Sequence, residues 1–367
     1  MRVNYINLKK ENLQLANKLK KKLILISKKS EFIGGEELEK FEKRFASFIG
    51  TKYAVGVSSG TSALYLSLKC INVDKNSEVI TVGNSWTSTV GAIILAGAKP
   101  RLVDVDKTLN IDIKKLEKKI TSKTKAIIPV HLTGNPANMK KLSRLAKKKK
   151  IKIIEDAAQA VGAKIGKKKV GSFGDFGCFS FHPLKNLSAL GDGGIITTNN
   201  KKYYHWLKTA RNVGHFNRDN CKFWSFNMRL DNLQAGFLNE KLKKINKIND
   251  DRNINAKLYI NNLNKKYIKL PEIEKNNYCV FHLFIIRVKE RDRLIKYLNK
   301  KNIEVKIHYP IPIHKLRSSK KIFSKIILKN TEKYSKEILS LPINQNLKPE
   351  QILWVCKQIN NFYEEKK

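Results

Sequence analysis

The feature that most constrains the fold is a repeated alternation of short apolar segments with amphipathic helical patterns between residues 53 and 198. Seven apolar segments are rich in β-branched residues, and most are followed by a helical pattern. They lie at 53–57, 78–82, 101–105, 126–131, 152–156, 178–181 and 194–198. Nearly continuous apolar strands joined by helical crossovers are typical of a parallel sheet that is covered on both faces. The sequence therefore predicts an α/β fold with a mainly parallel seven-stranded sheet sandwiched by helices.

The pattern changes in the last third of the chain. One long helix is predicted from about 232 to 265, and beyond Pro271 the strands and helices no longer alternate regularly. The expected elements there are a strand at 281–288, a helix at 290–301 and a terminal helix near 349–363. These patterns indicate a smaller α+β domain at the C-terminus. We expect a large domain over residues 1–250 and a small one over 251–367.

The net charge of +43 is the most unusual feature of the composition. Such a charge is compatible with a nucleic-acid-binding regulator, a different class of function from an enzyme. The basic residues are mostly lysines spread along the whole chain, and even the run Lys147–Lys150 follows an amphipathic helical pattern. The sequence contains no recognisable helix-turn-helix or RNA-binding motif. We therefore expect a solvated basic surface and no specific nucleic-acid partner.

The sequence indicates a cytoplasmic protein. No apolar run reaches the roughly 18 residues of a membrane helix, and the first ten residues lack the apolar core of a signal peptide. The cysteine count of five is odd, the cysteines are scattered, and there is no CxxC pair. This pattern favours free thiols in a reducing compartment over disulfides or a zinc site. No metal and no membrane association is expected.

Polar residues follow several of the predicted strands. In open parallel sheets, ligands bind outside the carboxyl ends of the strands, so these residues should converge on one site. They are Ser59–Ser62, Trp86, His131, Glu155–Gln159, Ser180, His182 and Lys185.

The segment from Phe176 to Gly194 carries the most reactive candidate, Lys185. A lysine at the end of a strand and screened from water is a candidate Schiff-base nucleophile, because burial lowers the pKa of its amine. The alternative is an ordinary solvated lysine, of which this chain has many. Asp156 at the end of another strand is either a helix cap or a buried carboxylate that requires a cationic partner.

Pyridoxal phosphate would use such a set, since it requires a lysine, a carboxylate at its pyridine nitrogen, a stacking aromatic ring and a phosphate cup. Trp86 could stack on the ring, or be a core residue. Gln159 could donate to the phenolic oxygen, or lie on the surface. The phosphate could bind at a hydroxyl-rich turn that begins a helix, although the same residues could be a simple N-cap. The phosphate candidates are Gly60, Thr61, Ser62 and Ser180.

Four motifs in this order resemble those of the DegT/StrS nucleotide-sugar aminotransferases. They are SSGTSAL, EDAAQA, SFHPLKNLSALGDGG and NMRLDNLQA, and the likeness covers nearly the whole chain. The resemblance implies a fold type I enzyme that depends on pyridoxal phosphate. It also implies roles for individual residues: Lys185 as the Schiff-base lysine and proton shuttle, Asp156 at the pyridine nitrogen, Trp86 on the ring, Gln159 near the phenolic oxygen, and Gly60, Thr61, Ser62 and Ser180 at the phosphate.

The same resemblance implies a homodimer with shared active sites. Asn227 would reach the phosphate of the other subunit, with Arg229 nearby. The implied reaction is a two-stage transamination from an amino acid, expected to be L-glutamate, to a ketone on a nucleotide-linked hexose. The sugar is expected to be a dTDP-3-keto-6-deoxyhexose for surface glycans, with a UDP-2-acetamido-3-keto sugar or a 4-keto sugar as alternatives.

Candidate substrate contacts are His182, Arg229, His308 and Tyr309, whereas His131 and His314 are interpreted as structural. A deoxysugar dehydratase is a third interpretation on the same fold. Family dehydratases carry histidine in place of the active-site lysine, so the presence of Lys185 argues against it.

Overall fold

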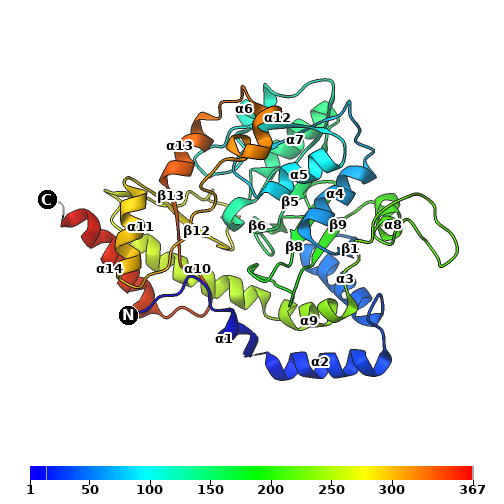
Figure 1. The fold of residues 1–367 in the computed structure, drawn as a ribbon, viewed down its shortest axis with the longest axis horizontal. Helices are drawn as coiled ribbons and strands as arrows, with labels where there is room; N and C mark the ends of the chain where they lie inside the picture. The colour runs from blue at the N-terminus through cyan, green and yellow to red at the C-terminus, as the bar shows by residue number, and fades with distance from the viewer. Residues whose placement is uncertain (14, 366–367) are drawn as a thin grey trace.

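The centre of the fold is a seven-stranded sheet (Figure 1), in a computed structural model that describes residues 1–13 and 15–365. The strands lie in the spatial order β1-β9-β8-β5-β4-β2-β3. Their bounds are β1 Tyr53–Val57, β2 Glu78–Val82, β3 Lys99–Val103, β4 Thr124–Ile127, β5 Lys152–Asp156, β8 Phe176–Ser180 and β9 Gly194–Thr198. Five of these strands form a parallel set, and β9 runs antiparallel to both of its neighbours, β8 and β1. The predicted mainly parallel seven-stranded sheet is thus confirmed.

One predicted strand is shorter than expected. The segment 126–131 was expected to be a strand throughout, but β4 ends at Ile127. Pro129 interrupts it because proline has no N–H to donate to a neighbouring strand. The chain continues alongside β5, where Asp156 N donates to Pro129 O and Val130 forms an isolated bridge with Asp156. The carboxyl end of this segment therefore stays next to that of β5.

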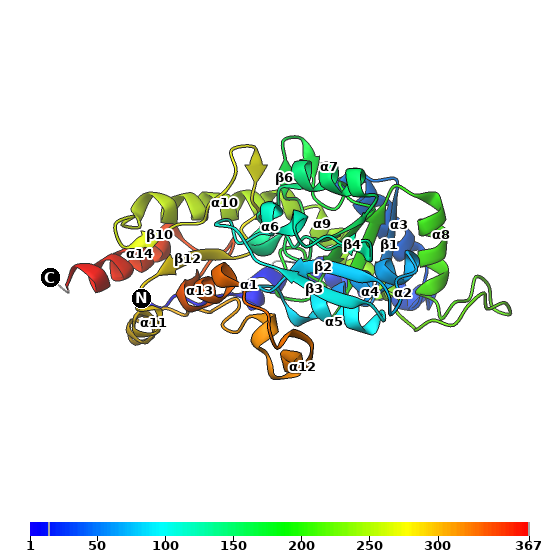
Figure 2. The same ribbon diagram turned by 90° about the horizontal axis from the view of Figure 1, so that it is seen from above.

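Helices cover both faces of the sheet (Figure 2). Side chains alternate along each strand, so that Val79 packs with α4 and α5 on one face while its neighbour Ile80 packs with α6 and α7 on the other. The helix α8 shares the first face, and α3 and α9 share the second. The bounds are α3 Glu36–Ile49, α4 Gly60–Cys70, α5 Thr87–Leu95, α6 Ile113–Glu117, α7 Met139–Lys149, α8 Lys201–Ala210 and α9 Asn232–Leu242.

A second core lies around a small antiparallel sheet of order β10-β12-β13. Its elements are α10 Ile245–Asn262, β10 Ile268–Lys269, β12 Phe284–Val288, α11 Arg291–Lys300, β13 Ile338–Leu341 and α14 Pro349–Glu364. The N-terminus also joins this core, because Val3 pairs with Ile303 and is buried there. The division into domains at residue 250 remains a prediction.

The single long helix predicted for 232–265 is wrong. The chain forms two helices, α9 and α10, which are separated at Lys243–Lys244. Leu238 in α9 is buried in the core of the large sheet, whereas Tyr259 in α10 is buried in the core of the small one. The break lets α9 pack on the core of the large sheet and α10 on the core of the small one. Hydrophobic periodicity alone does not reveal that the apolar faces of the two helices have different partners.

The segment 313–331 crosses back from the small sheet to the large one. Ile313, Phe323 and Leu328 pack with Val90 and Leu102 beside α5 and β3. Both Asn330 and Thr331 donate backbone hydrogen bonds to the buried carboxylate of Asp104, at 3.0 and 2.8 Å. This crossing holds the adjacent residues His308 and Tyr309 over the carboxyl edge of the large sheet.

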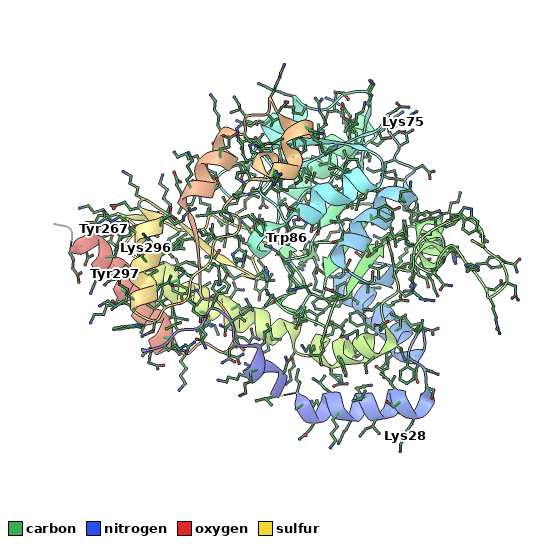
Figure 3. All side chains as sticks on the ribbon, in the orientation of Figure 1. Lys28, Lys75, Trp86, Tyr267, Lys296 and Tyr297 are labelled. Carbon is green, nitrogen blue, oxygen red and sulfur yellow. The ribbon has the colours of Figure 1, made fainter. Side chains whose placement is uncertain are left out.

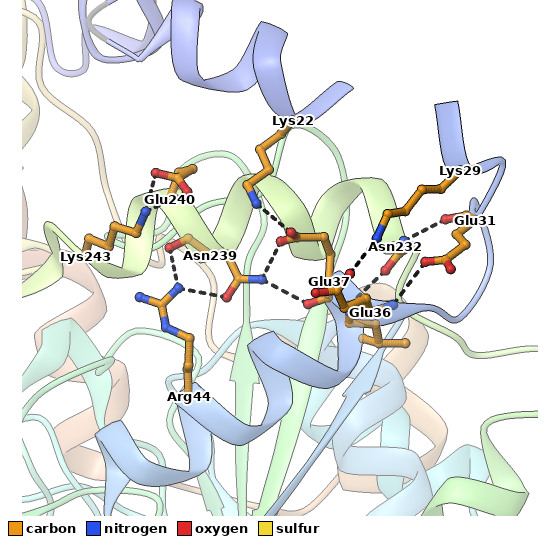
Figure 4. Close-up of polar contacts among 11 residues, drawn as sticks. Lys22, Lys29, Glu31, Glu36, Glu37, Arg44, Asn232, Asn239, Glu240 and Lys243 are labelled. Carbon is orange, nitrogen blue, oxygen red and sulfur yellow. Dashed lines mark hydrogen bonds and ion pairs between the residues drawn. The ribbon is translucent and has the colours of Figure 1, made fainter. Parts of the chain in front are cut away.

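Polar contacts tie α9 to α3, and α3 in turn to α2, Ala16–Lys29 (Figure 4). Asn232 accepts from Leu38 N, and so caps the first turn of α3 from another helix. Asn239 donates to the carboxylate and the carbonyl of Glu37, which also forms an ion pair with Lys22. The NMRLDNLQA motif thus has a structural function in α9 besides its place near the predicted site.

The remaining elements are short. They are α1 Leu8–Leu13, α12 Lys320–Phe323, α13 Lys329–Glu337, the 3₁₀ turns Leu132–Gly134, Ile313–Lys315 and Arg317–Ser319, and the small sheet β11-β6-β7 formed by Asn277–Tyr278, Lys164–Ile165 and Lys168–Lys169. Among the described helices, none combines the length and the apolar character that crossing a bilayer requires.

A buried carboxylate, Glu155, supports the strand end that carries Asp156. Glu155 is fully buried and accepts backbone hydrogen bonds from Gly171, Phe173 and Gly174 at 2.7 to 2.8 Å. It also pairs with Nε2 of the buried His131 at 3.1 Å. Because Ala137 N donates to Nδ1 of His131, the proton lies on Nε2 and is donated to Glu155.

We predict that Glu155→Ala lowers the free energy of unfolding by about 3 kcal/mol or more, because it leaves the buried His131 ring and three buried or partly buried backbone N–H groups without their acceptor. The measurement is the urea midpoint followed by circular dichroism, with Glu117→Ala as the control. Glu117 is exposed at the end of α6, and its substitution should change stability by about 0.5 kcal/mol or less. Equal effects of the two substitutions would contradict this role for Glu155.

Candidate active site

A cleft of about 660 Å³ lies at the carboxyl edge of the large sheet and is closed on the other side by residues of the small-sheet unit. Its volume is within the range of small-molecule sites. The predicted residues that line it together are Gly60, Thr61, Trp86, Asp156, Gln159, Ser180, His182, Lys185, His308 and Tyr309. The labelled Trp86 lies near the middle of the molecule, while labelled lysines such as Lys75 lie at its rim (Figure 3).

Lys185 lies in the turn that follows β8, where its backbone N–H donates to His182 O at 2.8 Å. The side chain is partly buried and lines the cleft. Burial disfavours the ammonium form and lowers the pKa of Lys185 to about 8, although the negative charge of Asp156 opposes this shift. A substantial fraction of the amine is therefore neutral near physiological pH, as a nucleophile requires.

Asp156 ends β5 and is 6% exposed. Its carboxylate accepts from Thr89 Oγ1 at 2.8 Å and from Ala158 N at 3.3 Å, and both of these partners are neutral. Burial raises the pKa of Asp156, while the hydrogen bonds and the positive charge of Lys185 moderate the increase. Among the described residues, no ion pair to Asp156 is formed, and a protonated ring nitrogen is the kind of cationic partner that such a carboxylate would accept.

Aromatic side chains form one wall of the cleft. Trp86 precedes α5 and is 61% exposed, so the alternative that it is a core residue is wrong. Its ring centroid is 5.6 Å from that of Tyr309. Gln159 accepts from Thr133 N at 2.7 Å and donates to the Tyr309 hydroxyl at 3.2 Å. Burial raises the pKa of Tyr309 to about 12, so the hydroxyl keeps its proton.

His308 stands on the small-sheet side of the cleft. Its Nδ1 lies 2.9 Å from Ser340 Oγ, and its ring stacks on Tyr5 with centroids 5.9 Å apart. Burial and the positive charge of Lys185 lower the pKa of His308 to about 4, so the imidazole is neutral at physiological pH. His182 is exposed and accepts from Leu184 N at 3.3 Å.

Three of the predicted phosphate residues, Gly60, Thr61 and Ser62, lie in the first turn of α4. Ser59 caps the helix by accepting from Ser62 N at 3.0 Å. The other amides at the very start of α4 have no acceptor within the helix, as at the start of any helix. A Cβ on Gly60 would lie 2.9 Å from Ser180 Cβ, so only glycine permits this approach of α4 to β8. Thr61 Oγ1 donates to Ser88 Oγ at 2.8 Å.

Three predicted residues do not line the cleft of their own chain. Ser62 is buried behind the turn, where its hydroxyl pairs with those of Ser58 and Ser59 at 2.8 and 2.9 Å. Asn227 and Arg229 lie beside β1 on the segment that returns from the long loop after α8, which extends away from the body (Figure 1). There Arg229 donates to Asn227 Oδ1 at 2.9 Å.

Sequence reasoning missed several residues of the cleft. Thr89, which holds Asp156, and Ser88 belong to a helix that was identified only by its apolar character. Arg252, His282 and Lys306 come from the second unit and reach the cleft through tertiary packing. No motif near them signals this position. His314, interpreted as structural, pairs through Nε2 with Glu332 at 2.9 Å.

Comparison with known proteins identifies the family. Residues 14–360 match the DegT/DnrJ/EryC1/StrS aminotransferase family. The chain belongs to this family. It is 38% identical over 98% of its length to the dTDP-3-amino-3,6-dideoxy-alpha-D-galactopyranose transaminase of Aneurinibacillus thermoaerophilus, of which the match covers 99%. The predicted family and enzyme class are confirmed.

Two solved structures show the same fold. DesV of S. venezuelae in complex with a ketimine intermediate is 32% identical, with 99% of each chain covered and a TM-score of 0.96. NtdA of Bacillus subtilis with bound cofactor PMP is 30% identical, with 100% of this chain and 86% of that chain covered and a TM-score of 0.93. The predicted fold type I architecture is confirmed.

We predict that the apoprotein captures pyridoxal phosphate on Lys185 at a rate that rises with pH, with a midpoint near the pKa of about 8 instead of the 10.5 of a free lysine. Asp156→Asn should lower this midpoint, because the negative charge that raises the pKa of the lysine is removed. Stopped-flow absorbance across a pH series measures the capture rate, and so the midpoint, of the wild type and of Asp156→Asn. An unchanged or higher midpoint in Asp156→Asn would show that the two groups do not interact.

Proposed function

We propose that this aminotransferase moves an amino group from L-glutamate to the 3-keto group of a dTDP-linked 6-deoxyhexose, in the synthesis of aminosugars for surface glycans. The observation that carries the chemistry is the presence of Lys185 and Asp156 in one cleft, beside an aromatic wall and a hydroxyl-rich helix start. The choice of sugar is supported by the 3-amino-6-deoxy product in the name of the Aneurinibacillus relative.

Family membership and the likeness to a PMP-bound structure confirm pyridoxal phosphate as the cofactor. The donor set of the cleft fits it. Lys185 would form the covalent link, and Asp156 would hold the proton on the ring nitrogen. The hydroxyls and amides of Gly60, Thr61 and Ser180 would bind the phosphate, and Trp86 would cover the ring. The bound group supplies the electron sink that transamination requires.

The chain itself supplies the proton transfer. Once its amine is released, Lys185 is the base that removes a proton from the amino donor and returns one to the acceptor carbon. This requires a neutral amine, which burial favours. His308, Tyr309 and His182 surround the space around this amine and are the proposed contacts of the sugar. Lys306 at the same cleft, together with the basic surface, would attract the anionic nucleotide sugar.

We further propose that the working form is a homodimer in which Asn227 completes the site of the partner subunit. Support comes from the loop that precedes Asn227, which presents Phe216, Trp224 and Phe226 to solvent, with Trp224 93% exposed. Large apolar groups on a projecting loop are costly unless a partner covers them. Arg229 holds the side chain of Asn227 and would orient it toward the partner.

The proposed compartment is the cytoplasm. All five cysteines are free thiols, and Cys178, Cys279 and Cys356 are buried. Buried, unpaired thiols are typical of proteins that work in a reducing environment.

The substrate proposal is tested by incubating the enzyme, pyridoxal phosphate and L-glutamate with a panel of dTDP- and UDP-linked keto sugars, with mass detection of the aminated product. We expect kcat/KM for the dTDP-3-keto-6-deoxyhexose to exceed that for the UDP-2-acetamido-3-keto and 4-keto sugars by about tenfold or more. Lys185→Ala should give no product with any of them. A preference for a UDP sugar or a 4-keto sugar would contradict the proposal.

The shared site is tested by mixing two inactive variants, Lys185→Ala and Asn227→Ala, and reassociating them at random. In a dimer with shared sites, half of the dimers are mixed and each contains one intact site, so activity should return to about a quarter of the wild-type value. If both residues serve the site of their own chain, mixing will restore nothing. Light scattering on the wild type should give the mass of a dimer.

A further inference from the structure

A buried network of side chains joins the residue after Lys185 to the small-sheet unit. The side-chain amide of Asn186 donates to Asn249 Oδ1 at 3.0 Å and to Val280 O at 3.1 Å, and Asn249 donates in turn to Val161 O at 3.0 Å. Both hydrogens on Nδ2 of Asn186 are thereby used, so its Oδ1 is available only as an acceptor. Asn186 and Asn249 are 6% and 1% exposed.

His282 is the partner of that oxygen. Its Nδ1 lies 3.2 Å from Asn186 Oδ1 and must carry the proton that is donated. Burial and the positive charges of Lys185 and Arg252 hold the pKa of His282 well below its ordinary value, so the ring is neutral and Nε2 has no proton. The ring also lines the cleft. It thus contacts the loop of Lys185 through one nitrogen and is near the reacting groups.

The backbone around His282 is held firmly. Val280 N donates to Gly134 O at 3.1 Å and Leu283 N donates to Thr133 O at 3.3 Å. The guanidinium of Arg252 donates to Phe281 O at 3.1 Å. Phe281 itself has a φ of +43°, a left-handed conformation that a bulky residue rarely adopts. Such conformations persist where the surroundings enforce them, and they concentrate at functional sites.

We propose that His282 is a positioning residue for Lys185, which through its Nδ1–H bond to Asn186 sets the place of the lysine relative to Asp156. The inference rests on the proposed function, since Lys185 must be the reacting amine. A lysine has a long, flexible side chain, and its amine reaches one point reproducibly only if its backbone is fixed. The network supplies that fixed point from the opposite unit of the protein.

The experiment compares substitutions that keep or remove the donor. His282→Asn places an amide N–H close to the position of Nδ1, His282→Gln places one nearer to that of Nε2, and His282→Phe removes both. Asn186→Leu removes the acceptor. His205→Asn, at an exposed histidine of α8, is the matched control. The readouts are the rate at which the apoprotein captures pyridoxal phosphate, the lysine trapped by borohydride, and the urea midpoint.

We expect His282→Phe to slow capture by about 10- to 100-fold, as misplacement of a reacting group does, while His282→Asn stays within about threefold of the wild type. Asn186→Leu should be as slow as His282→Phe, and the double variant no slower than either, because both remove the same bond. The control should match the wild type in every readout.

Three results would overturn the proposal. One is a normal rate in His282→Gln together with a slow rate in His282→Asn, which would assign the function to Nε2. The second is a loss of rate that follows the urea midpoint across all variants, which would make the role structural. The third is an equal rate in all variants. Capture by a lysine other than Lys185 in the wild type would overturn the proposed function itself, and this inference with it.

Discussion

The rest of the site depends on the placement of an amine and a carboxylate, Lys185 and Asp156, in one cleft that is largely withdrawn from water. Removal from water destabilises the charged form of both groups, and the pKa values move toward each other as a result. Their mutual attraction offsets only part of this cost. The site is therefore poised to receive a molecule that takes the amine into a covalent bond and offers a cation to the carboxylate.

The end of β5 is rigid because its two acidic residues face opposite ways. Side chains alternate along a strand, so Asp156 faces the cleft while Glu155 points away from it into the interior. Glu155 collects three backbone N–H groups of the 171–174 turn and the imidazole of His131. The hydrogen bonds of Glu155 fix the end of the strand, so Asp156 does not need an ion pair to hold its position. Thr89 then orients the carboxylate from α5.

The small-sheet unit contributes side chains to the cleft as well as covering it. His308 and Tyr309 reach the cleft because the segment that follows them is anchored on Asp104 of the large unit. His282 reaches it from the start of β12, and Arg252 holds the backbone beside it. The cleft therefore forms only when the core of the large sheet and the core of the small sheet are correctly placed relative to each other. The carboxylate of Asp104 and the guanidinium of Arg252 provide that placement by hydrogen bonds to the backbone, and His282 adds a bond to the side chain of Asn186.

The sequence by itself determined the sheet, because continuous β-branched runs cannot be solvated and must be covered on both faces. It also determined the residue types of the site, since lysine, carboxylate, aromatic ring and hydroxyl-rich turn all follow predicted strands. Only the tertiary structure decided where the helix predicted for 232–265 breaks, that Ser62 faces inward, and that His282 meets Asn186. These outcomes depend on contacts between residues far apart in the chain, and no local pattern of hydrophobicity or turn chemistry encodes such contacts.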